Sequence, residues 1–231
     1  MRKTVDSIYI LIIIISILFI HSCKKDSISL CGEEFLGEMY LLESSRNSIP
    51  YNENSNLFFQ DSLGNEILFE VDMNNRGYEV WDGHFSMQCE HDPTQQKVYG
   101  VIFDDYRYYL IDKSDSLNIR FLIELSVSAS SDPFTIDTVS DRLHIHRSSK
   151  YDTVSYASNL QIIVNPRNMP ENEVDWFEKP VEELQLLDKT FNDVYISNLD
   201  SNEYYNYESG LIAFKDWDGK LWVLDRVEKM N

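Results

Sequence analysis

The sequence predicts a mainly β protein, built as an antiparallel meander, sandwich or barrel with at most one short helix. Apolar and polar residues alternate in several short runs, Asn, Asp, Ser and Gly separate these runs, and 13% of the residues are aromatic. Alternation with a period of two is the pattern of a strand with one buried face. Short strands separated by polar turns are typical of antiparallel sheets.

The chain begins with the features of a secretory signal peptide. Arg2 and Lys3 precede the apolar stretch IYILIIIISILFI, which covers the 13 residues Ile8–Ile20. A membrane-spanning helix needs about 20 apolar residues, so this stretch is too short to remain as a span. We therefore expect residues 1–22 to be a signal that is removed. A retained N-terminal membrane anchor is the alternative.

Ile20-His21-Ser22-Cys23 resembles the lipobox of bacterial lipoproteins, with His21 where a small or aliphatic residue is usual. The resemblance implies that Cys23 is the lipidation site, carries acyl chains such as palmitate, and becomes the mature N-terminus. Two or more chains hold a protein stably at a membrane, whereas one holds it only marginally. Lys24 rather than an acidic residue follows Cys23, which in such lipoproteins implies sorting to the outer membrane.

The sequence resembles uncharacterised outer-membrane lipoproteins of Bacteroidota at its start and near its C-terminus. The similarity lies in the start CKKDS, in the abundance of Asn, Asp, Ser, Ile and Tyr, and in a C-terminal stretch from Tyr204 with a Gly turn and a Trp-bearing strand. It implies a protein anchored by lipid to the cell outer membrane, facing the periplasm or the surface. We expect residues 23–30 to form a tether and residues 31–231 a single β-rich domain.

The charge of the mature chain limits its partners. Removal of residues 1–22 leaves 18 basic and 38 acidic side chains, a net charge of −20. Such a chain repels nucleic acid and anionic membrane surfaces, so we expect no nucleic-acid partner and attachment through the lipid alone. Acidity also keeps an exported protein soluble and monomeric, and we expect a monomer.

Two cysteines remain once Cys23 is assigned to lipid. An even pair in an oxidising compartment favours a disulfide between Cys31 and Cys89, with two buried thiols as the alternative. The two residues are 58 positions apart. A bond that closes such a loop stabilises a fold by roughly 4 kcal/mol in the chain-entropy model, before any strain is subtracted.

The clearest strand is predicted over Leu117–Val127, where every second residue of LNIRFLIELSV is Leu, Ile, Phe or Val. The opposite face carries mostly polar residues, as a half-buried strand requires. Five shorter runs have the same character, namely EILFEV, GYEVW, VYGVIF, RYYLI and LQIIV, which end at Val71, Trp81, Phe103, Ile111 and Val164.

Two tight hairpin turns are predicted in FQDSLGNEILF from Phe59 and FKDWDGKLWVL from Phe214. Each has an Asp two residues and a Gly five residues after the Phe. The Asp side chain can accept a hydrogen bond from a backbone amide two residues on, and Gly adopts a positive φ. We interpret the similarity as repeated turn chemistry rather than a duplicated domain; duplication remains the alternative.

One helix is expected in the segment from Pro170 to Asp188. Val181, Leu184 and Leu187 would share one helical face after Pro180, which suits a first helical turn. A helix there would cap one end of the sheet or barrel.

Candidate catalytic and metal sites are few. His144 and His146 place both imidazoles on one face of a strand, but no third ligand follows at a short distance, so we expect solvent-exposed histidines. Asp216-Trp217-Asp218-Gly219 resembles part of a calcium loop, yet Phe214 stands where that loop needs an oxygen ligand, which favours a turn. No catalytic, cofactor or metal residue is predicted.

Adjacent carboxylates do not supply an acid/base pair either. Asp104-Asp105 and Glu182-Glu183 are neighbours in sequence, so their side chains point to different sides of a strand or helix. The sequence also contains no Gly-rich phosphate loop, nucleophile elbow or zincin motif.

Tyrosines gather in two clusters whose rings would lie on both faces of their strands. The clusters are Tyr106, Tyr108 and Tyr109, and Tyr204, Tyr205 and Tyr207. Exposed rings can stack on sugars or on a partner protein. Tyrosine also simply suits strands, with its hydroxyl in water, and this is the interpretation we favour.

These observations predict a lipid-anchored envelope protein that is a non-enzymatic binding or structural module, with a glycan or an envelope protein as partner. An exported hydrolase that uses carboxylates is the alternative. A hydrolase should have a deep pocket with convergent carboxylates, whereas a binding module should present aromatic surface.

Overall fold

The computed structural model describes residues 30–51, 55–89, 91–129, 139–150, 157–169, 179–197 and 202–229. Contacts divide the chain into two compact units, one of Met1–Phe35 with His84–Gly100 and one of Leu36–Gly83 with Val101–Asn231. The predicted mainly β class with at most one short helix is confirmed in these ranges. The division into signal, tether and a single domain stays a prediction.

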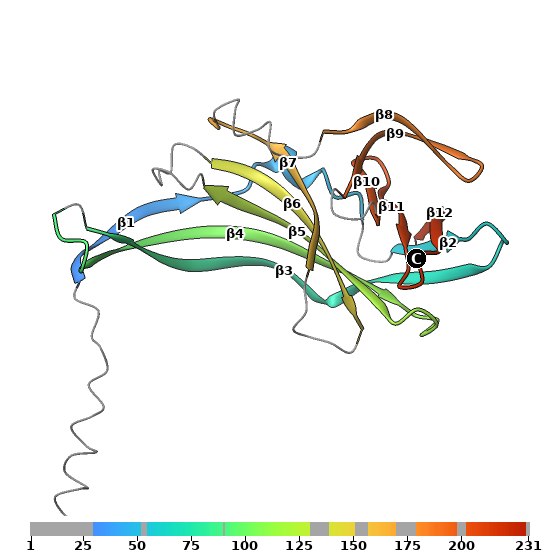
Figure 1. Ribbon diagram of the computed structural model, residues 1–231, viewed down its shortest axis with the longest axis horizontal. Helices are drawn as coiled ribbons and strands as arrows, with labels where there is room; N and C mark the ends of the chain where they lie inside the picture. The colour runs from blue at the N-terminus through green and yellow to red at the C-terminus, as the bar shows by residue number, and fades with distance from the viewer. Residues whose placement is uncertain are drawn as a thin grey trace, which may run out of the picture. The chain divides into compact units, whose positions relative to one another are not determined.

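The strands pair into an antiparallel sheet, which curls into a half-barrel within the larger unit (Figure 1). Their order in the sheet is β7-β6-β5-β4-β3-β2-β12-β11-β10-β9-β8, and β1 pairs with β4. The helix is α2, Glu43–Arg46. The strands are β1 Leu30–Met39, β2 Ser55–Gln60, β3 Glu66–Gln88, β4 Gln96–Asp112, β5 Ile119–Ala129, β6 Val139–Ser149, β7 Ala157–Asn165, β8 Val181–Leu186, β9 Lys189–Ile196, β10 Glu203–Asn206, β11 Gly210–Lys215 and β12 Leu221–Lys229.

Four runs that the sequence predicts as separate strands are joined into two long ones. The runs ending at Val71 and Trp81 both lie in β3, and those ending at Phe103 and Ile111 both lie in β4. In β4 the polar residues between the runs are buried and engaged. Asp104 accepts a hydrogen bond from the amide of Leu41, and Asp105 pairs with Arg107. Because these side chains have partners, the strand continues through them.

Four phenylalanines form the centre of the larger unit. Phe59 on β2, Phe69 on β3, Phe121 on β5 and Phe214 on β11 are each fully buried. Phe214 touches the other three, with ring centroids 5.1 to 5.5 Å away. Strands β5 and β11 are separated by β4, β3, β2 and β12 in the sheet. In a flat sheet five strand spacings would put them about 24 Å apart, so contact between Phe121 and Phe214 requires the curl.

Residues 40–51 are held on the sheet by two buried carboxylates. Asp104 on β4 accepts the Leu41 amide at 2.6 Å and pairs with Arg46 of α2 at 3.2 Å. Asp141 on β6 accepts the Ser45 hydroxyl at 2.5 Å and pairs with Arg167 at 2.6 Å. Both carboxylates are inaccessible to solvent. These charges are buried only because each has such partners.

Tyr51 locks the end of this segment against the hairpin formed by β10 and β11. Its hydroxyl oxygen accepts a hydrogen bond from the Leu211 amide at 2.5 Å. The neighbouring Gly210 has φ +81°, and a Cβ added there would lie 2.1 Å from the Tyr51 hydroxyl. The hydroxyl of Tyr205 donates to the Ser48 carbonyl at 2.7 Å. Glycine is therefore required at 210 for both conformation and space.

The prediction of a helix after Pro180 is wrong. Val181 and Leu184 lie in β8, which pairs antiparallel with β9, and Leu187 lies in the turn between them with φ +54°. Pairing with β9 replaces the helical hydrogen bonds, and the three apolar residues do not share a face. Residues 170–178 lie outside the described residues.

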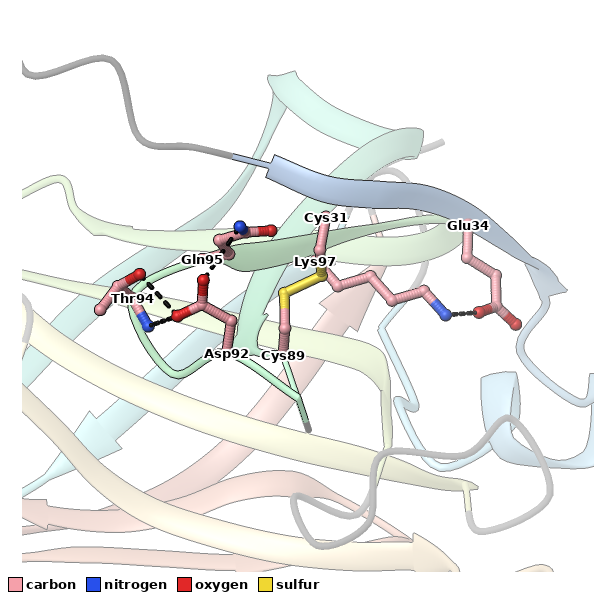
Figure 2. The surroundings of a disulfide bond; sticks show 7 residues. All are labelled: Cys31, Glu34, Cys89, Asp92, Thr94, Gln95 and Lys97. Carbon is pink, nitrogen blue, oxygen red and sulfur yellow. Dashed lines mark hydrogen bonds and ion pairs between the residues drawn. A yellow bond between two sulfur atoms is a disulfide. The ribbon is translucent and has the colours of Figure 1, made fainter.

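The smaller unit contains the predicted disulfide, which the structure confirms between Cys31 at the start of β1 and Cys89 after β3 (Figure 2). Their Cα atoms are 6.6 Å apart. The turn between β3 and β4 is ordered by Asp92, whose carboxylate accepts hydrogen bonds from the amide and hydroxyl of Thr94 and from the side chain of Gln95. These hydrogen bonds lower the pKa of Asp92.

Gly210→Ala should destabilise the protein far more than Gly64→Ala, although the two glycines have nearly the same φ. Both variants put an L residue into the left-handed region, at a cost of about 1 kcal/mol or more. Only Gly210→Ala also collides with Tyr51, which adds roughly 1–3 kcal/mol. Urea unfolding of the two variants measures the difference. Equal losses of stability would show that the Tyr51 contact is not tight.

Candidate functional site

The β11–β12 turn is organised by one carboxylate. Oδ1 of Asp216 accepts hydrogen bonds from the amides of Asp218 and Lys220, at 3.0 and 2.9 Å. Its Oδ2 accepts the indole N–H of Trp222 at 3.0 Å. Gly219 has φ +80°, as the turn requires. The predicted turn chemistry is confirmed, and these bonds fix the residue between Asp216 and Asp218 in position.

That residue is Trp217, which is 54% exposed. The guanidinium of Arg147, on β6, lies over its ring at 4.7 Å from the ring centroid. A cation over an indole face contributes about 0.5–1 kcal/mol at an exposed site. One face of the ring is therefore supported by protein, while half of the side chain remains open to solvent.

Arg147 is itself fixed by two further contacts. Its Nη1 donates to the Lys215 carbonyl of β11 at 2.5 Å, and its Nε lies 3.3 Å from a carboxylate oxygen of Glu203 on β10. Glu203 is inaccessible to solvent. A buried charge pair of this kind is costly to disrupt, because one partner would remain buried alone. Arg147, Trp217 and Glu203 together are called the Trp217 site below.

The β2–β3 turn has the same construction. Asp61 Oδ1 accepts the amides of Leu63 and Asn65, each at 2.8 Å, and Gly64 has φ +79°. The other oxygen accepts the Asn65 side-chain amide and pairs with Lys220 of the β11–β12 turn. This ion pair joins the two similar turns, which adjoin because β2 pairs with β12.

A cavity of about 290 Å³ lies beside this second turn. It is lined by Gln60–Ser62 and Gly64, by Leu187 and Asp188 of the β8–β9 turn, by Lys189 at the start of β9, and by Val223. This volume is at the lower limit for small-molecule pockets, which have volumes of about 300–1,000 Å³. Two carboxylates, Asp61 and Asp188, belong to the lining.

Asp61 is unsuited to act as a general acid. Burial opposes its ionisation, but hydrogen bonds from Asn65 and Lys220 and from the Leu63 amide outweigh that effect and lower the pKa of Asp61 far below its usual value. A carboxylic acid that donates a proton near neutral pH needs a raised pKa. All the partners of Asp61 belong to the two turns, so its role is to hold them.

His144 and His146 lie on one face of β6, as predicted, with rings stacked 5.9 Å apart. The expectation that they are solvent-exposed is wrong, because both are half-buried. Glu124 of β5 and Gln161 of β7 lie opposite His144 in the sheet. Among the described residues no group of three or more His, Cys, Asp or Glu side chains could hold a metal ion.

The tyrosine clusters contribute less exposed ring surface than the sequence allows. Tyr108, Tyr204 and Tyr205 are buried, and Tyr106, Tyr109 and Tyr207 are half-buried. Tyr204 and Tyr205 are adjacent yet both buried, because the pairing of β10 with β11 shifts register between them. The sequence offered these clusters as candidate aromatic surface, with the strand preference of tyrosine as the favoured interpretation, and Trp217 was not among the candidates.

The N-terminal segment predicted to carry the lipid, including Cys23, lies outside the described residues. Within the ranges that the structure describes, no helix is long and apolar enough to cross a membrane. No family model, curated protein or solved structure matches this chain. Lipidation and localisation stay predictions.

His144→Gln should weaken the pH dependence of stability. Burial, with help from the nearby charges of His146 and Arg142, lowers the pKa of His144 to about 4 from an ordinary 6.5. Between these values the unfolded chain binds more protons, so stability falls as the pH drops from about 7 to 4, by up to about 3 kcal/mol for this group.

Urea unfolding at several pH values measures this effect. Comparison with the unaltered protein removes the contribution of the carboxylates, because it is the same in both proteins. His91→Gln, at an exposed position, is the control for the loss of a surface histidine. Parallel profiles for His144→Gln and the unaltered protein would contradict the burial of His144 in its neutral form.

Proposed function

We propose that the protein is a lipid-anchored envelope protein and a non-enzymatic binding module that contacts its partner through the Trp217 site. The single observation that carries the binding part is Trp217, an exposed indole held by a tight turn and by Arg147. The lipid part rests on the sequence that leads to Cys23.

A rigid, half-exposed tryptophan suits recognition. Tryptophan supplies a large contact area with few rotatable bonds, so little side-chain entropy is lost on binding. Here the turn hydrogen bonds of Asp216 and the stacked Arg147 fix the ring before a partner arrives. Pre-organisation of this kind raises affinity because the cost of ordering is already met by folding.

The chemistry of the site favours a glycan or an envelope protein as partner. The open part of the indole can stack on the apolar face of a sugar ring or on a partner's apolar surface. The net charge of −19 disfavours nucleic acid. An outer-membrane location, with the chain facing the periplasm or the surface, would place both kinds of partner within reach.

The carboxylates support a binding module over the alternative hydrolase. Asp104, Asp141 and Glu203 are buried and paired with arginines, which gives them structural roles. Asp61, which lines the cavity, has a lowered pKa, and both of its carboxylate oxygens already accept hydrogen bonds. A glycosidase needs one carboxyl group that stays protonated near neutral pH, and Asp61 does not meet this need.

Trp217→Ala should weaken binding of the purified mature protein to its partner by about tenfold, as expected for a central aromatic contact. The screen uses a glycan array and envelope extracts. Trp217→Phe should keep part of the affinity, and Leu63→Ala, at the 81% exposed tip of the similar turn, should keep all of it. Equal binding by all variants would remove Trp217 from the proposal.

Turnover of a polysaccharide or peptide that is abolished by Asp61→Asn or Asp188→Asn would establish the hydrolase instead.

Acylation is tested separately by intact mass. Protein extracted from membranes should carry the mass of a diacylglyceryl group and an acyl chain at Cys23, and Cys23→Ala should abolish it. A mature chain without lipid would contradict the anchoring part of the proposal and would not affect the binding part.

A further inference from the structure

We infer that the disulfide-bonded end of the β3–β4 hairpin rests on the membrane and that Phe35 and Met87 contact the lipid surface there. This hairpin end consists of residues 31–35, 86–89 and 91–100. The inference rests on the proposed acylation of Cys23 and adds an orientation to it.

Covalent geometry keeps the hairpin end close to the lipid. Cys31 follows Cys23 by eight residues. A chain of that length spans at most about 28 Å when fully extended. The disulfide then brings Cys89, at the end of the hairpin, within 6.6 Å of Cys31 between Cα atoms. The end of the hairpin is therefore tied near the bilayer by a short tether and a covalent bond, although Cys89 is far from Cys23 in sequence.

The same unit exposes two large apolar side chains. Phe35 on β1 is 61% exposed, and Met87 on β3 is 39% exposed. A single exposed apolar residue needs no explanation in a soluble protein. Here, however, the two belong to the part of the chain that the tether holds nearest the lipid. Burial of either side chain in the bilayer interface removes apolar area from water, which is favourable.

Charge on the hairpin end points to a zwitterionic lipid surface. Glu34 is paired with Lys97, and Asp92 is engaged by Thr94 and Gln95 (Figure 2). Glu33 and Asp92 leave the hairpin end with a net negative charge, because Thr94 and Gln95 are neutral donors. The chain as a whole carries −19 as well, so anionic headgroups would repel it, whereas a zwitterionic surface would not.

Photocrosslinking tests the contact. Full-length acylated protein carries p-benzoylphenylalanine in place of Phe35, of Met87 or of Leu63, and is reconstituted into phosphatidylcholine vesicles. Leu63 is the matched control, because it is 81% exposed and belongs to the other unit. Mass spectrometry after irradiation should find lipid adducts at positions 35 and 87 in yields about fivefold above position 63, which corresponds to about 1 kcal/mol of preference.

The outcomes separate this inference from the proposed function. Equal adduct yields at the three positions, on protein whose intact mass shows acylation, overturn the inference and leave the proposed function intact. Protein without acylation overturns the inference and the anchoring part of the proposed function, and it leaves the binding part standing. Vesicles that also contain phosphatidylglycerol should give lower yields at positions 35 and 87. Higher yields there would contradict the assignment to zwitterionic lipid.

Discussion

Contact between Phe121 and Phe214 is the constraint on which the larger unit depends. Their rings are 5.1 Å apart, although four strands separate β5 from β11 in the sheet. The sheet can bring them together only by curling, and Phe59 and Phe69 fill the space between. Burial of each ring contributes about 1.5–3 kcal/mol. The half-barrel therefore follows from apolar side chains that collect on one face of a long antiparallel sheet.

Polar side chains at the edges of this core hold the neighbouring surface segments in position. Arg147, opposite Phe121 in the pairing of β5 with β6, contacts Lys215 and Glu203, and its guanidinium lies over the Trp217 ring. Asp104 and Asp141 hold residues 40–51. The indole is thus presented by the same curl that builds the core. The proposed binding role of Trp217 and the structural role of the buried carboxylates both rest on this architecture.

Local chemistry was readable from the sequence, and distant contacts were not. The turns at Asp61 and Asp216 and the Cys31–Cys89 bond depend on short-range rules or on pairing by count, and the structure has all of them. The continuous β4 depends on the Leu41 amide that engages Asp104, a partner 63 residues away. β8 replaces the expected helix because it pairs with β9. The Trp217 site was missed because Arg147 and the indole are 70 residues apart in sequence.

A double-mutant cycle between Phe121→Leu and Phe214→Leu tests the central claim most directly. The free energy of unfolding of both single variants and the double variant is measured in urea. We expect a coupling energy of about 0.5–1.5 kcal/mol, since the rings touch. Phe121→Leu combined with Phe58→Leu, at a half-buried position of β2 next to Phe59, should be additive. Additivity of Phe121 and Phe214 as well would contradict the account, because it would show that β5 and β11 do not meet across the core.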